Sequence, residues 1–380
     1  MPTEADIDRL RLIRTEGVGP ITYRRLLARY RTPAAALDAV PHLVRSGGSS
    51  TAPAIPTASQ VRREFDAAEK LKARLIFLGD PDYPPLLAEL DDAPPVFAVL
   101  GDAALLSLPA IAIVGGRNAS ASGLKMAETL AEDLADKVTI VSGLARGIDG
   151  IAHTAAMRTG RTVAAIASGL DIAYPAENAN LQRLIAERGA VISEAPPGTE
   201  PQARHFPKRN RLIAGLSLGV LVVEAARRSG SLITANIARD AGRDIFAVPG
   251  SPLDPRARGG NDLIREGAVL TATAQDVLDN LSGFGGLFPR RSRVEQSAGF
   301  SEDAGFSEEQ TEIESLSDTG DARDRVLALL GPTPAKVDDL TRRCQLSASA
   351  VMAVLLELEL SGRVEPLPGN RFALLPDVRS

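Results

Sequence analysis

The sequence predicts an α/β protein: a doubly wound parallel sheet, with a helical domain before it and a winged-helix domain after it. Between Pro109 and about Leu281, six short apolar segments alternate with segments of helical periodicity, as in strands joined by right-handed helical crossovers. The first of them, Ile111–Val114, is continuously apolar, which is typical of a strand buried on both faces. Residues 323–380 show three helical segments and a hairpin pattern, which predict the winged helix.

Six segments are predicted as strands of the sheet and five as the helices between them. The strands are Ile111–Val114, Thr139–Ser142, Thr162–Ile166, Val191–Ser193, Gly219–Val223 and Asp244–Val248. The helices lie near residues 124–135, 149–159, 178–188, 209–216 and 231–241. Two earlier apolar runs, Leu75–Leu78 and Val96–Leu100, lie among five prolines and are predicted as edge strands.

The turn after the first strand predicts an anion site. Gly115 and Gly116 end the strand, and Ser120 or Ser122 can cap the helix that follows. A strand, a glycine turn and a helix start together point backbone N–H groups at an anion, usually a phosphate. Arg117 lies in the turn, where its guanidinium can add a bidentate contact to the same phosphate.

The segments after the other strands have a similar composition. In a parallel sheet they meet at one edge, where ligands bind. They are rich in glycine and serine and carry two arginines: Gly115–Arg117, Ser142–Gly147, Ser168–Asp171, Glu194, Glu224 and Ser229–Ser231. Together they predict an anion pocket.

Positive charge is densest in the segment Ala203–Arg211. Its basic residues can bind a phosphate backbone, Phe206 can stack on an unpaired base, and Asn210 can bond to a base edge. The alternative is a solvated helix start with Pro207 near its first position. The nucleic-acid interpretation is favoured because Arg209–Arg211 stand beside the predicted pocket.

The formal net charge of −5 is unevenly distributed. Residues 294–322 contain nine acidic residues and no lysine or arginine, so the rest of the chain carries a net charge of +4. The folded parts are therefore slightly basic, which is compatible with a phosphate-binding surface.

Composition also predicts a cytoplasmic protein without metal, cofactor or membrane partner. No apolar stretch reaches the roughly 18 to 20 residues that span a bilayer, and the first residues lack the apolar region of a signal peptide. The single cysteine, Cys344, excludes an internal disulfide. One cysteine with three histidines argues against a structural zinc site.

Four domains or linkers are predicted along the chain. Residues 1–70 form a helical domain, 71–282 the sheet domain, 283–322 a disordered acidic linker and 323–380 the winged helix. The Gly17–Gly19 turn resembles a helix-hairpin-helix that contacts DNA phosphates, although a plain corner between helices is the favoured interpretation. The third helix of the winged helix, Ala348–Leu360, has two glutamates and no basic residue, so DNA binding and protein contact are equal alternatives for it.

Several enzyme classes are excluded or disfavoured. The first strand is not followed by Gly-x-Gly-x-x-Gly, and the second has no acidic residue at its end, so NAD binding is not expected. The sequence has no P-loop and no serine nucleophile elbow. His153 lies four residues after Asp149, and we interpret it as a structural histidine.

Six motifs, in the same order, resemble those of the DNA-processing protein A (DprA/Smf) family. They are Ile113–Arg117, Ile140–Asp149, Phe206–Ser217, Val223–Ala225, Ser229–Ala235 and Phe246–Gly250. The resemblance runs from roughly Tyr83 through Ala268. It implies an extended Rossmann-like core, and the flanking SAM-like or helix-hairpin-helix-like and winged-helix domains also occur in that family.

The resemblance implies a protein that is not an enzyme. Such a protein binds and protects single-stranded DNA and loads the RecA recombinase onto it in natural transformation or recombinational repair. It displaces single-strand-binding protein and works as a homodimer through the Rossmann-like core. By motif, Arg117, Gly143, Arg146 and Lys208–Arg211 match the family's strand-binding segments. The residues expected to bind DNA are Arg117, Ser120, Gly143, Arg146, Gly169, Phe206, Lys208, Arg209, Asn210 and Arg211.

One position departs from the family pattern. Gly116 stands where the family usually has a hydroxyl residue, which removes one hydrogen bond to phosphate, worth about 1 kcal/mol.

Two other functions are kept as alternatives. One is a nucleotide hydrolase like the lysine-decarboxylase-like enzymes, whose essential glutamate has no counterpart in Leu232–Arg239. The other is a regulator that binds duplex DNA through the winged helix and senses a phosphorylated ligand in the core.

Overall fold

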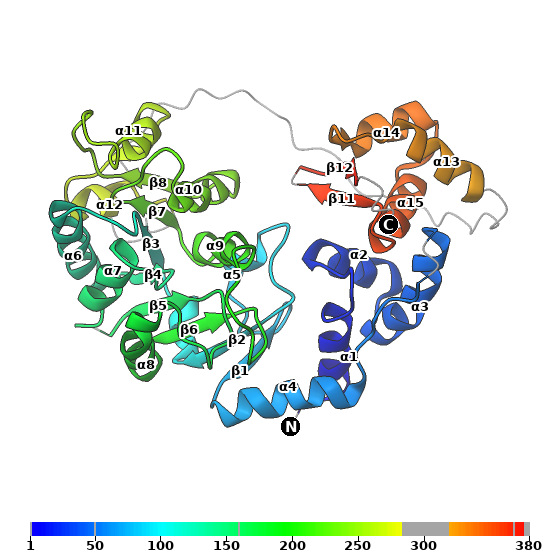
Figure 1. Cartoon of the computed structure of the whole chain (residues 1–380), viewed down its shortest axis with the longest axis horizontal. Coiled ribbons are helices and arrows are strands. Elements are labelled where there is room, and N and C mark those ends of the chain that lie inside the picture. The colour runs from blue at the N-terminus through cyan, green and yellow to red at the C-terminus, as the bar shows by residue number, and fades with distance from the viewer. Residues whose placement is uncertain (1, 49–50, 159, 283–318, 368, 376–380) are drawn as a thin grey trace. The chain divides into compact units, whose positions relative to one another are not determined.

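The computed structural model describes residues 2–48, 51–158, 160–282, 319–367 and 369–375 (Figure 1). Its contacts divide the chain into two compact units. The larger unit holds residues 1–14 and 56–288, and the smaller holds residues 15–55 and 289–380. The predicted N-terminal helical domain is thus shared between the two units, and each unit is described by itself below.

A nine-stranded sheet forms the centre of the larger unit, in the order β1-β2-β6-β5-β4-β3-β7-β8-β9. Strands β6 to β9 in this order run parallel, whereas β1 pairs antiparallel with β2 and β2 with β6. The strands are β1 (Arg74–Phe77), β2 (Val96–Gly101), β3 (Ala110–Val114), β4 (Thr139–Ser142), β5 (Thr162–Ala165), β6 (Ala190–Ser193), β7 (Gly219–Val222), β8 (Asp244–Ala247) and β9 (Val269–Leu270). Every predicted strand is confirmed to within one residue at either end. The sequence missed β9, because two residues are too few to show a periodic pattern.

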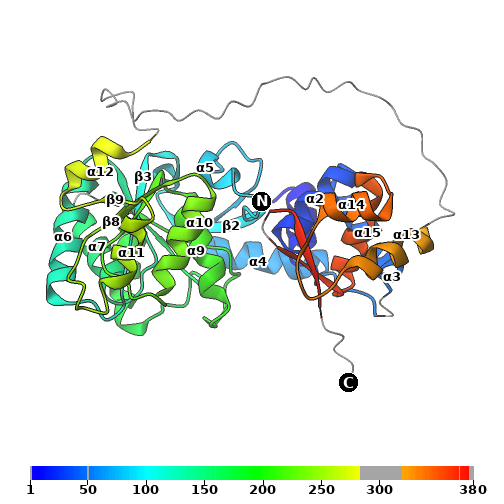
Figure 2. The ribbon, with the colours of Figure 1, turned by 90° about the horizontal axis from the view of Figure 1, so that it is seen from above.

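Helices cover both faces of this sheet (Figure 2). One face packs against α5 (Pro85–Ala88), α9 (His205–Gly215), α10 (Gly230–Asp240) and α11 (Arg258–Arg265). The other packs against α6 (Ala121–Ala135), α7 (Ile148–Ala156), α8 (Ala179–Arg188) and α12 (Ala274–Asn280). Because both faces are covered, β3 is buried at every position, as its apolar sequence predicted. Helix α9 begins four residues earlier than predicted and takes Pro207 into its first turn.

The order of the strands creates a crevice beside β3. From β3 the chain proceeds outward through β4, β5 and β6, and then returns to add β7, β8 and β9 on the other side. The loops that follow β3 and β7 therefore lead to opposite faces of the sheet. Such a reversal leaves an opening at the carboxyl ends of the two strands, where open α/β sheets bind their ligands.

Two helices from the N-terminal region complete the larger unit. Helices α1 (Glu4–Ile13) and α4 (Ala58–Lys70) pack their apolar faces on the edge of the sheet. Both begin with a capping box, in which Thr3 and Thr57 each exchange hydrogen bonds with the residue three positions later.

The smaller unit contains the predicted winged helix. Its elements are α2 (Pro20–Tyr30), α3 (Pro33–Ser46), α13 (Thr319–Leu329), β10 (Ala335–Lys336), α14 (Val337–Cys344), α15 (Ala348–Leu360), β11 (Val364–Leu367) and β12 (Arg371–Leu374). Ser347 caps α15, and Gly362 follows its end with a φ of 71°. Residues 283–318 of the predicted acidic linker lie outside the described residues, and residues 319–322 belong to α13.

Helix α15 packs against α2 and α3 within this unit. Glu359 of α15 is buried, accepts a hydrogen bond from the Thr22 hydroxyl and pairs with Arg25 at 2.9 Å. The Arg25 guanidinium also lies 4.8 Å from the ring centroid of Phe372. The third helix of the winged helix therefore makes an intramolecular protein contact through its C-terminal half.

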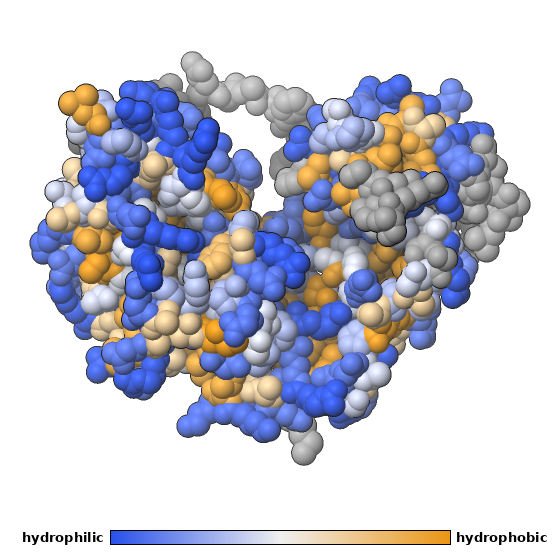
Figure 3. All heavy atoms as spheres, viewed as in Figure 1, coloured by the Kyte–Doolittle hydropathy of each residue, from blue (hydrophilic) through white to orange (hydrophobic). Residues whose placement is uncertain are grey.

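Over the ranges that the structure describes, no helix combines the length and the apolar character needed to span a membrane. Figure 3 shows hydrophilic side chains over much of the visible face of the larger unit, with hydrophobic ones in small separate groups.

Candidate nucleic-acid interface

A cavity of about 830 Å³ opens at the carboxyl ends of β3 and β7. This is the edge of the sheet at which the sequence predicted an anion pocket. Its walls come from the turn after β3 (Val114–Asn118), the loop and helix start after β7 (Glu224–Thr234), the first turns of α9 and the loop after β5. Four arginines and two carboxylates line it: Arg117, Arg209, Arg228, Arg256, Asp149 and Glu224. The lining therefore carries a net positive charge.

Gly115 and Gly116, in the turn after β3, differ in the space that a Cβ atom would have. A Cβ atom on Gly115 would lie 2.6 Å from Cγ1 of Ile148, so only glycine lets the turn approach α7. At Gly116 the nearest atom to such a Cβ is the carbonyl oxygen of Glu224, at 3.5 Å. Gly116 therefore has space for a side chain, and the hydroxyl residue usual in the family would fit there.

Ser120 is the cap of α6, which decides between the two serines that the sequence offered. Its hydroxyl accepts a hydrogen bond from the N–H of Gly123 at 2.9 Å and donates one to the carboxylate of Glu224. Glu224 also accepts the N–H of Ser120 at 2.9 Å. The Ser120 side chain does not line the cavity, and its hydroxyl is already used twice within the fold. Both side chains hold the start of α6 beside β7.

Arg117 and Phe206 lie against each other in the cavity wall. The Arg117 side chain is exposed, and its guanidinium carbon lies 5.4 Å from the centroid of the Phe206 ring. Tyr174, from the loop after β5, lies on the same ring, with 5.6 Å between the two centroids. Tyr174 is 46% exposed, large for an aromatic side chain. A cation and two aromatic rings thus stand together in one wall of the cavity.

Arg209 is buried and connects the loop after β4 to the end of β5. It donates to the carbonyl oxygens of Gly143 and of Ala165, the latter at 2.7 Å. Asp149 accepts the N–H of Gly143 at 3.2 Å. Burial raises the pKa of Asp149, an effect that Arg209 opposes, and burial lowers the pKa of Arg209 to about 10.

These contacts change the interpretation of Arg209 and Gly143. Both were expected to bind DNA, but a Cβ atom on Gly143 would overlap the Arg209 guanidinium. Gly143 is therefore glycine because the buried arginine passes against it. The guanidinium of Arg209 is engaged by protein carbonyls, and it holds the floor of the cavity in place.

Arg211 is a second arginine of this segment that the structure buries. Its guanidinium donates to the carbonyl oxygen of Asp92 and to the carboxylate of Glu194. It ties the end of β6 to the segment before β2 and does not line the cavity. The basic segment is exposed at Pro207 and Lys208 and buried from Arg209 onward, because α9 is enclosed by the rest of the unit from that point.

Three further predicted residues lie outside the cavity wall. Arg146 is exposed and pairs with Glu177 at 2.8 Å. Gly169 packs in a turn, where its Cβ would lie 2.8 Å from the carbonyl oxygen of Pro196. Lys208 is exposed on α9. Of the ten residues expected to bind DNA, the structure brings together Arg117, Phe206, Arg209 and Asn210 in the cavity wall, and it places elsewhere Ser120, Gly143, Arg146, Gly169, Lys208 and Arg211.

His153 is a structural residue, as the sequence predicted. It is fully buried in α7, and its Nδ1 lies 2.7 Å from the hydroxyl oxygen of Thr162. Burial, together with the nearby charge of Arg209, lowers the pKa of His153 to about 3. Across the described residues, no group of three metal-binding side chains is found.

Comparison with known proteins agrees with this architecture. The family described as DNA recombination-mediator protein A matches residues 74–282. A DprA-like N-terminal helix-hairpin-helix domain matches residues 3–67, and a DprA winged helix domain matches residues 310–370. The chain belongs to the DNA recombination-mediator protein A family.

Relatives within this family cover most of the chain. Protein Smf of Escherichia coli is 39% identical over 295 residues, which are 77% of this chain and 75% of the relative. The crystal structure of DNA processing protein A from Streptococcus pneumoniae has a TM-score of 0.62 at 36% identity, over 74% of this chain and 98% of that one. A structure of DNA processing protein A from Helicobacter pylori, described for its single-stranded DNA binding mode, has a TM-score of 0.50 at 31% identity and covers 55% and 95% of the two chains.

For this member of the DNA recombination-mediator protein A family, sequence reasoning missed three residues of the cavity wall. Tyr174, Arg228 and Arg256 line it, yet none was among the residues expected to bind DNA. Tyr174 lies three residues after the predicted segment Ser168–Asp171, and Arg228 lies immediately before the predicted segment Ser229–Ser231. The available signals were an aromatic residue, Tyr174, in the segment after β5 and an arginine, Arg228, in the segment after β7.

Proposed function

We propose that this chain binds single-stranded DNA in the cavity at the carboxyl ends of β3 and β7. The observation that carries the proposal is the wall in which Arg117 lies against Phe206, with Tyr174 on the same ring. A guanidinium supplies a phosphate contact, and exposed rings stack on unpaired bases. Bases are available for stacking in a single strand and are enclosed in a duplex, so this combination favours single strands.

The finer role rests on membership of the family. We propose that the chain protects single-stranded DNA and loads the RecA recombinase onto it, displacing single-strand-binding protein, in transformation or recombinational repair. We also propose that two copies associate through the Rossmann-like core and that this occurs in the cytoplasm. Support comes from the family match over residues 74–282.

The protein acts, in this proposal, by binding and not by catalysis. The two carboxylates that line the cavity are both engaged by protein groups, Glu224 by Ser120 and Asp149 by the N–H of Gly143. A glycosidic hydrolase needs a carboxylate that reaches its substrate. The occupied carboxylates thus support binding over hydrolysis.

The packing of helix α15 disfavours the duplex-binding regulator. A winged helix reads duplex DNA with its third helix in the major groove. In this chain α15 has Glu359 buried against Thr22 and Arg25. The contact supports a protein-binding role for the winged helix.

Fluorescence anisotropy with labelled oligonucleotides tests the proposal. We expect single strands to bind more tightly than a duplex of the same length. Arg117→Ala should weaken binding and flatten the log–log salt dependence by about 0.7, the contribution of one phosphate contact to a single strand. The control is Arg183→Ala, which removes an exposed arginine of α8 outside the cavity and makes the same change in charge.

Two results would contradict this assignment. If Arg117→Ala binds single strands as the wild type does, the cavity is not the DNA site. If duplex DNA binds more tightly, the regulator becomes the better interpretation.

A further inference from the structure

The carboxylate of Glu224 lies on the start of helix α6, beside the cavity. It accepts hydrogen bonds from the N–H of Ser120, at 2.9 Å, and from the hydroxyl of the same residue. Ser120 is the N-cap of α6. Glu224 lines the cavity and Ser120 does not, so the glutamate separates the helix start from the cavity. The sequence predicted that this helix start would face an anion, usually a phosphate, and in the structure the anion is a side chain of the protein itself.

This contact replaces a capping box that α6 lacks. In a capping box, the third residue of the helix is a glutamate or glutamine whose side chain accepts the N–H of the N-cap. The third residue of α6 is Gly123, which has no side chain. A Cβ atom on Gly123 would lie 2.5 Å from Cδ of Glu224. Gly123 therefore leaves the space that a carboxylate from the segment after β7 fills.

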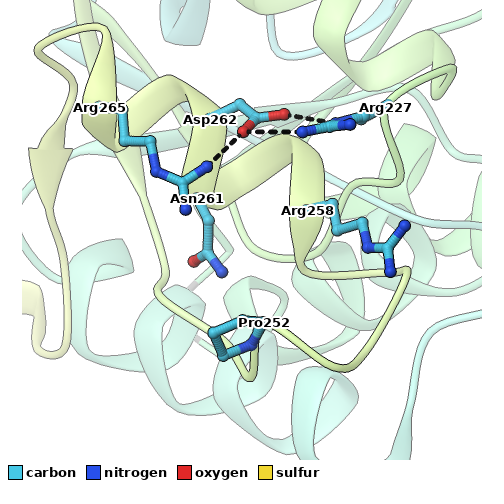
Figure 4. Close-up of a pocket in the computed structure, with 6 residues that line it drawn as sticks. All are labelled: Arg227, Pro252, Arg258, Asn261, Asp262 and Arg265. Carbon is cyan, nitrogen blue, oxygen red and sulfur yellow. Dashed lines mark hydrogen bonds and ion pairs between the residues drawn. The ribbon is translucent and has the colours of Figure 1, made fainter.

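Within the described part of the chain, no ion pair neutralises Glu224. Arg256 acts on it only from a longer distance. Figure 4 shows the contrasting arrangement at Asp262, which lies between Arg227 and Arg265 and pairs with them at 2.7 and 2.8 Å. The positive end of the α6 dipole offsets roughly half of an elementary charge. A negative charge therefore remains at this point of a wall that is otherwise rich in arginine.

We infer that Glu224 is a specificity-determining residue, which keeps free nucleotides out of the cavity and so reserves it for single-stranded DNA. The inference rests on the proposed function and concerns the same site. A free nucleotide has a base that can stack on Phe206 and Tyr174 and a phosphate that Arg117 can bind. The groups that bind a strand therefore also suit a nucleotide, and discrimination between the two needs a repulsive element.

Strand and nucleotide differ in the charge and the position of their phosphates. A phosphodiester within a strand carries one negative charge, whereas a phosphate monoester carries about −1.5 to −2 at neutral pH. Rossmann-like sheets bind nucleotides with the phosphates on the helix start that follows the first strand of the fold. In this chain the carboxylate of Glu224 occupies that position and repels a dianion. A strand can instead place its phosphates beside Arg117, which is exposed.

The test is the binding of ADP to the full chain without added magnesium, measured by isothermal titration calorimetry. Glu224→Ala removes the charge and opens the helix start. Glu224→Gln removes the charge alone, and its side chain can turn aside into the cavity. We expect no saturation of the wild type at millimolar ADP, an affinity at least about tenfold higher in Glu224→Ala, and an intermediate one in Glu224→Gln. Adenosine, which has no phosphate, should bind all three proteins alike.

A competition experiment places the gained nucleotide in the cavity. ADP should displace a labelled single-stranded oligonucleotide from Glu224→Ala and leave it bound to the wild type. The matched control is Glu187→Ala, which removes an exposed glutamate of α8 outside the cavity and should treat ADP as the wild type does.

The outcomes separate this inference from the proposed function. If the wild type binds ADP as tightly as both variants, or if neither variant gains affinity, Glu224 excludes nothing and the inference is wrong. Glu224→Gln decides this even where circular dichroism shows that Glu224→Ala does not fold. An equal gain for adenosine would also overturn it, because the phosphate would then play no part. In each of these cases the proposed function stands as long as the wild type binds single strands. If the wild type binds none, the proposed function is wrong and the role of Glu224 in selecting strands fails with it.

Discussion

The side chains of Arg209 and Asp149 both form hydrogen bonds with the backbone of Gly143. Asp149 accepts the N–H of Gly143, and Arg209 donates to its carbonyl oxygen. Both side chains are buried, and each compensates the charge of the other. The loop after β4 is thereby fixed beside the cavity, so Arg209, which was predicted to bind DNA, also supports the cavity wall that it lines.

This arrangement predicts strong coupling between the two residues. Arg209→Met leaves Asp149 buried without its compensating charge, and Asp149→Asn leaves the arginine in the same state. We expect each to lower the free energy of unfolding by about 3 kcal/mol. The double variant should lose less than the sum, because no unpaired charge then remains. Urea denaturation of the four proteins measures this, and strictly additive losses would contradict the coupling.

The aromatic wall predicts a dependence on bases. Phe206→Ala and Tyr174→Ala should each weaken single-strand binding by about 1 to 3 kcal/mol, since each removes a stacking surface. Tyr174→Phe keeps the ring and should bind nearly as the wild type does. These proteins should all bind an oligonucleotide with abasic positions with nearly the same affinity. If the alanine variants lose the same affinity for it, the rings do not stack on bases.

The space at Gly116 predicts a variant with higher affinity. Gly116→Ser places a hydroxyl where a Cβ atom meets nothing closer than 3.5 Å. One added hydrogen bond to phosphate should increase affinity by about 1 kcal/mol, roughly fivefold. Gly116→Ala is the matched control, because it adds the Cβ atom without the donor. The prediction fails if the serine and alanine variants bind alike in anisotropy titrations.

The contact between Arg25 and Glu359 predicts how the winged helix is held. Burial raises the pKa of Glu359, while Thr22 and Arg25 oppose that effect. Arg25→Met should therefore destabilise the smaller unit by about 3 kcal/mol, since it leaves the carboxylate buried without its cation. Combining it with Glu359→Gln should recover part of the loss. Amide hydrogen exchange in α15 measures the change, and unaltered protection in Arg25→Met would refute the contact's importance.

His153 predicts a loss of stability in mild acid. Its pKa falls from an ordinary 6.5 to about 3 in the folded protein because it is buried. The unfolded chain then binds a proton that the folded one does not, so stability falls as pH drops from about 6.5 toward 3, by up to about 1.4 kcal/mol per pH unit. Burial raises the pKa of Asp149, which acts in the opposite direction and is common to both proteins compared. Thermal melts of His153→Gln should show a weaker dependence on pH over this range, and equal dependence would exclude the histidine.

The sequence by itself determined every strand of the large sheet except β9, the winged helix and the edge of the sheet that holds the cavity. Strands covered on both faces are continuously apolar. A glycine turn before a capped helix points backbone N–H groups at an anion. Local patterns therefore identified β3, its turn and the cap position at Ser120 or Ser122. Arg117 was found because it lies in the turn after β3, and Phe206 because it lies in the basic segment Ala203–Arg211.

Only the tertiary structure decided which basic residues face the cavity and which are buried. Arg209 and Arg211 are two positions apart in one helix, and burial of each depends on acceptors from distant segments, Gly143 and Asp92. Tyr174 was not predicted, because it joins Phe206 only when the loop after β5 meets the start of α9. A sequence pattern reports the periodicity of one segment, whereas the partners of a buried charge or an exposed ring come from segments far along the chain.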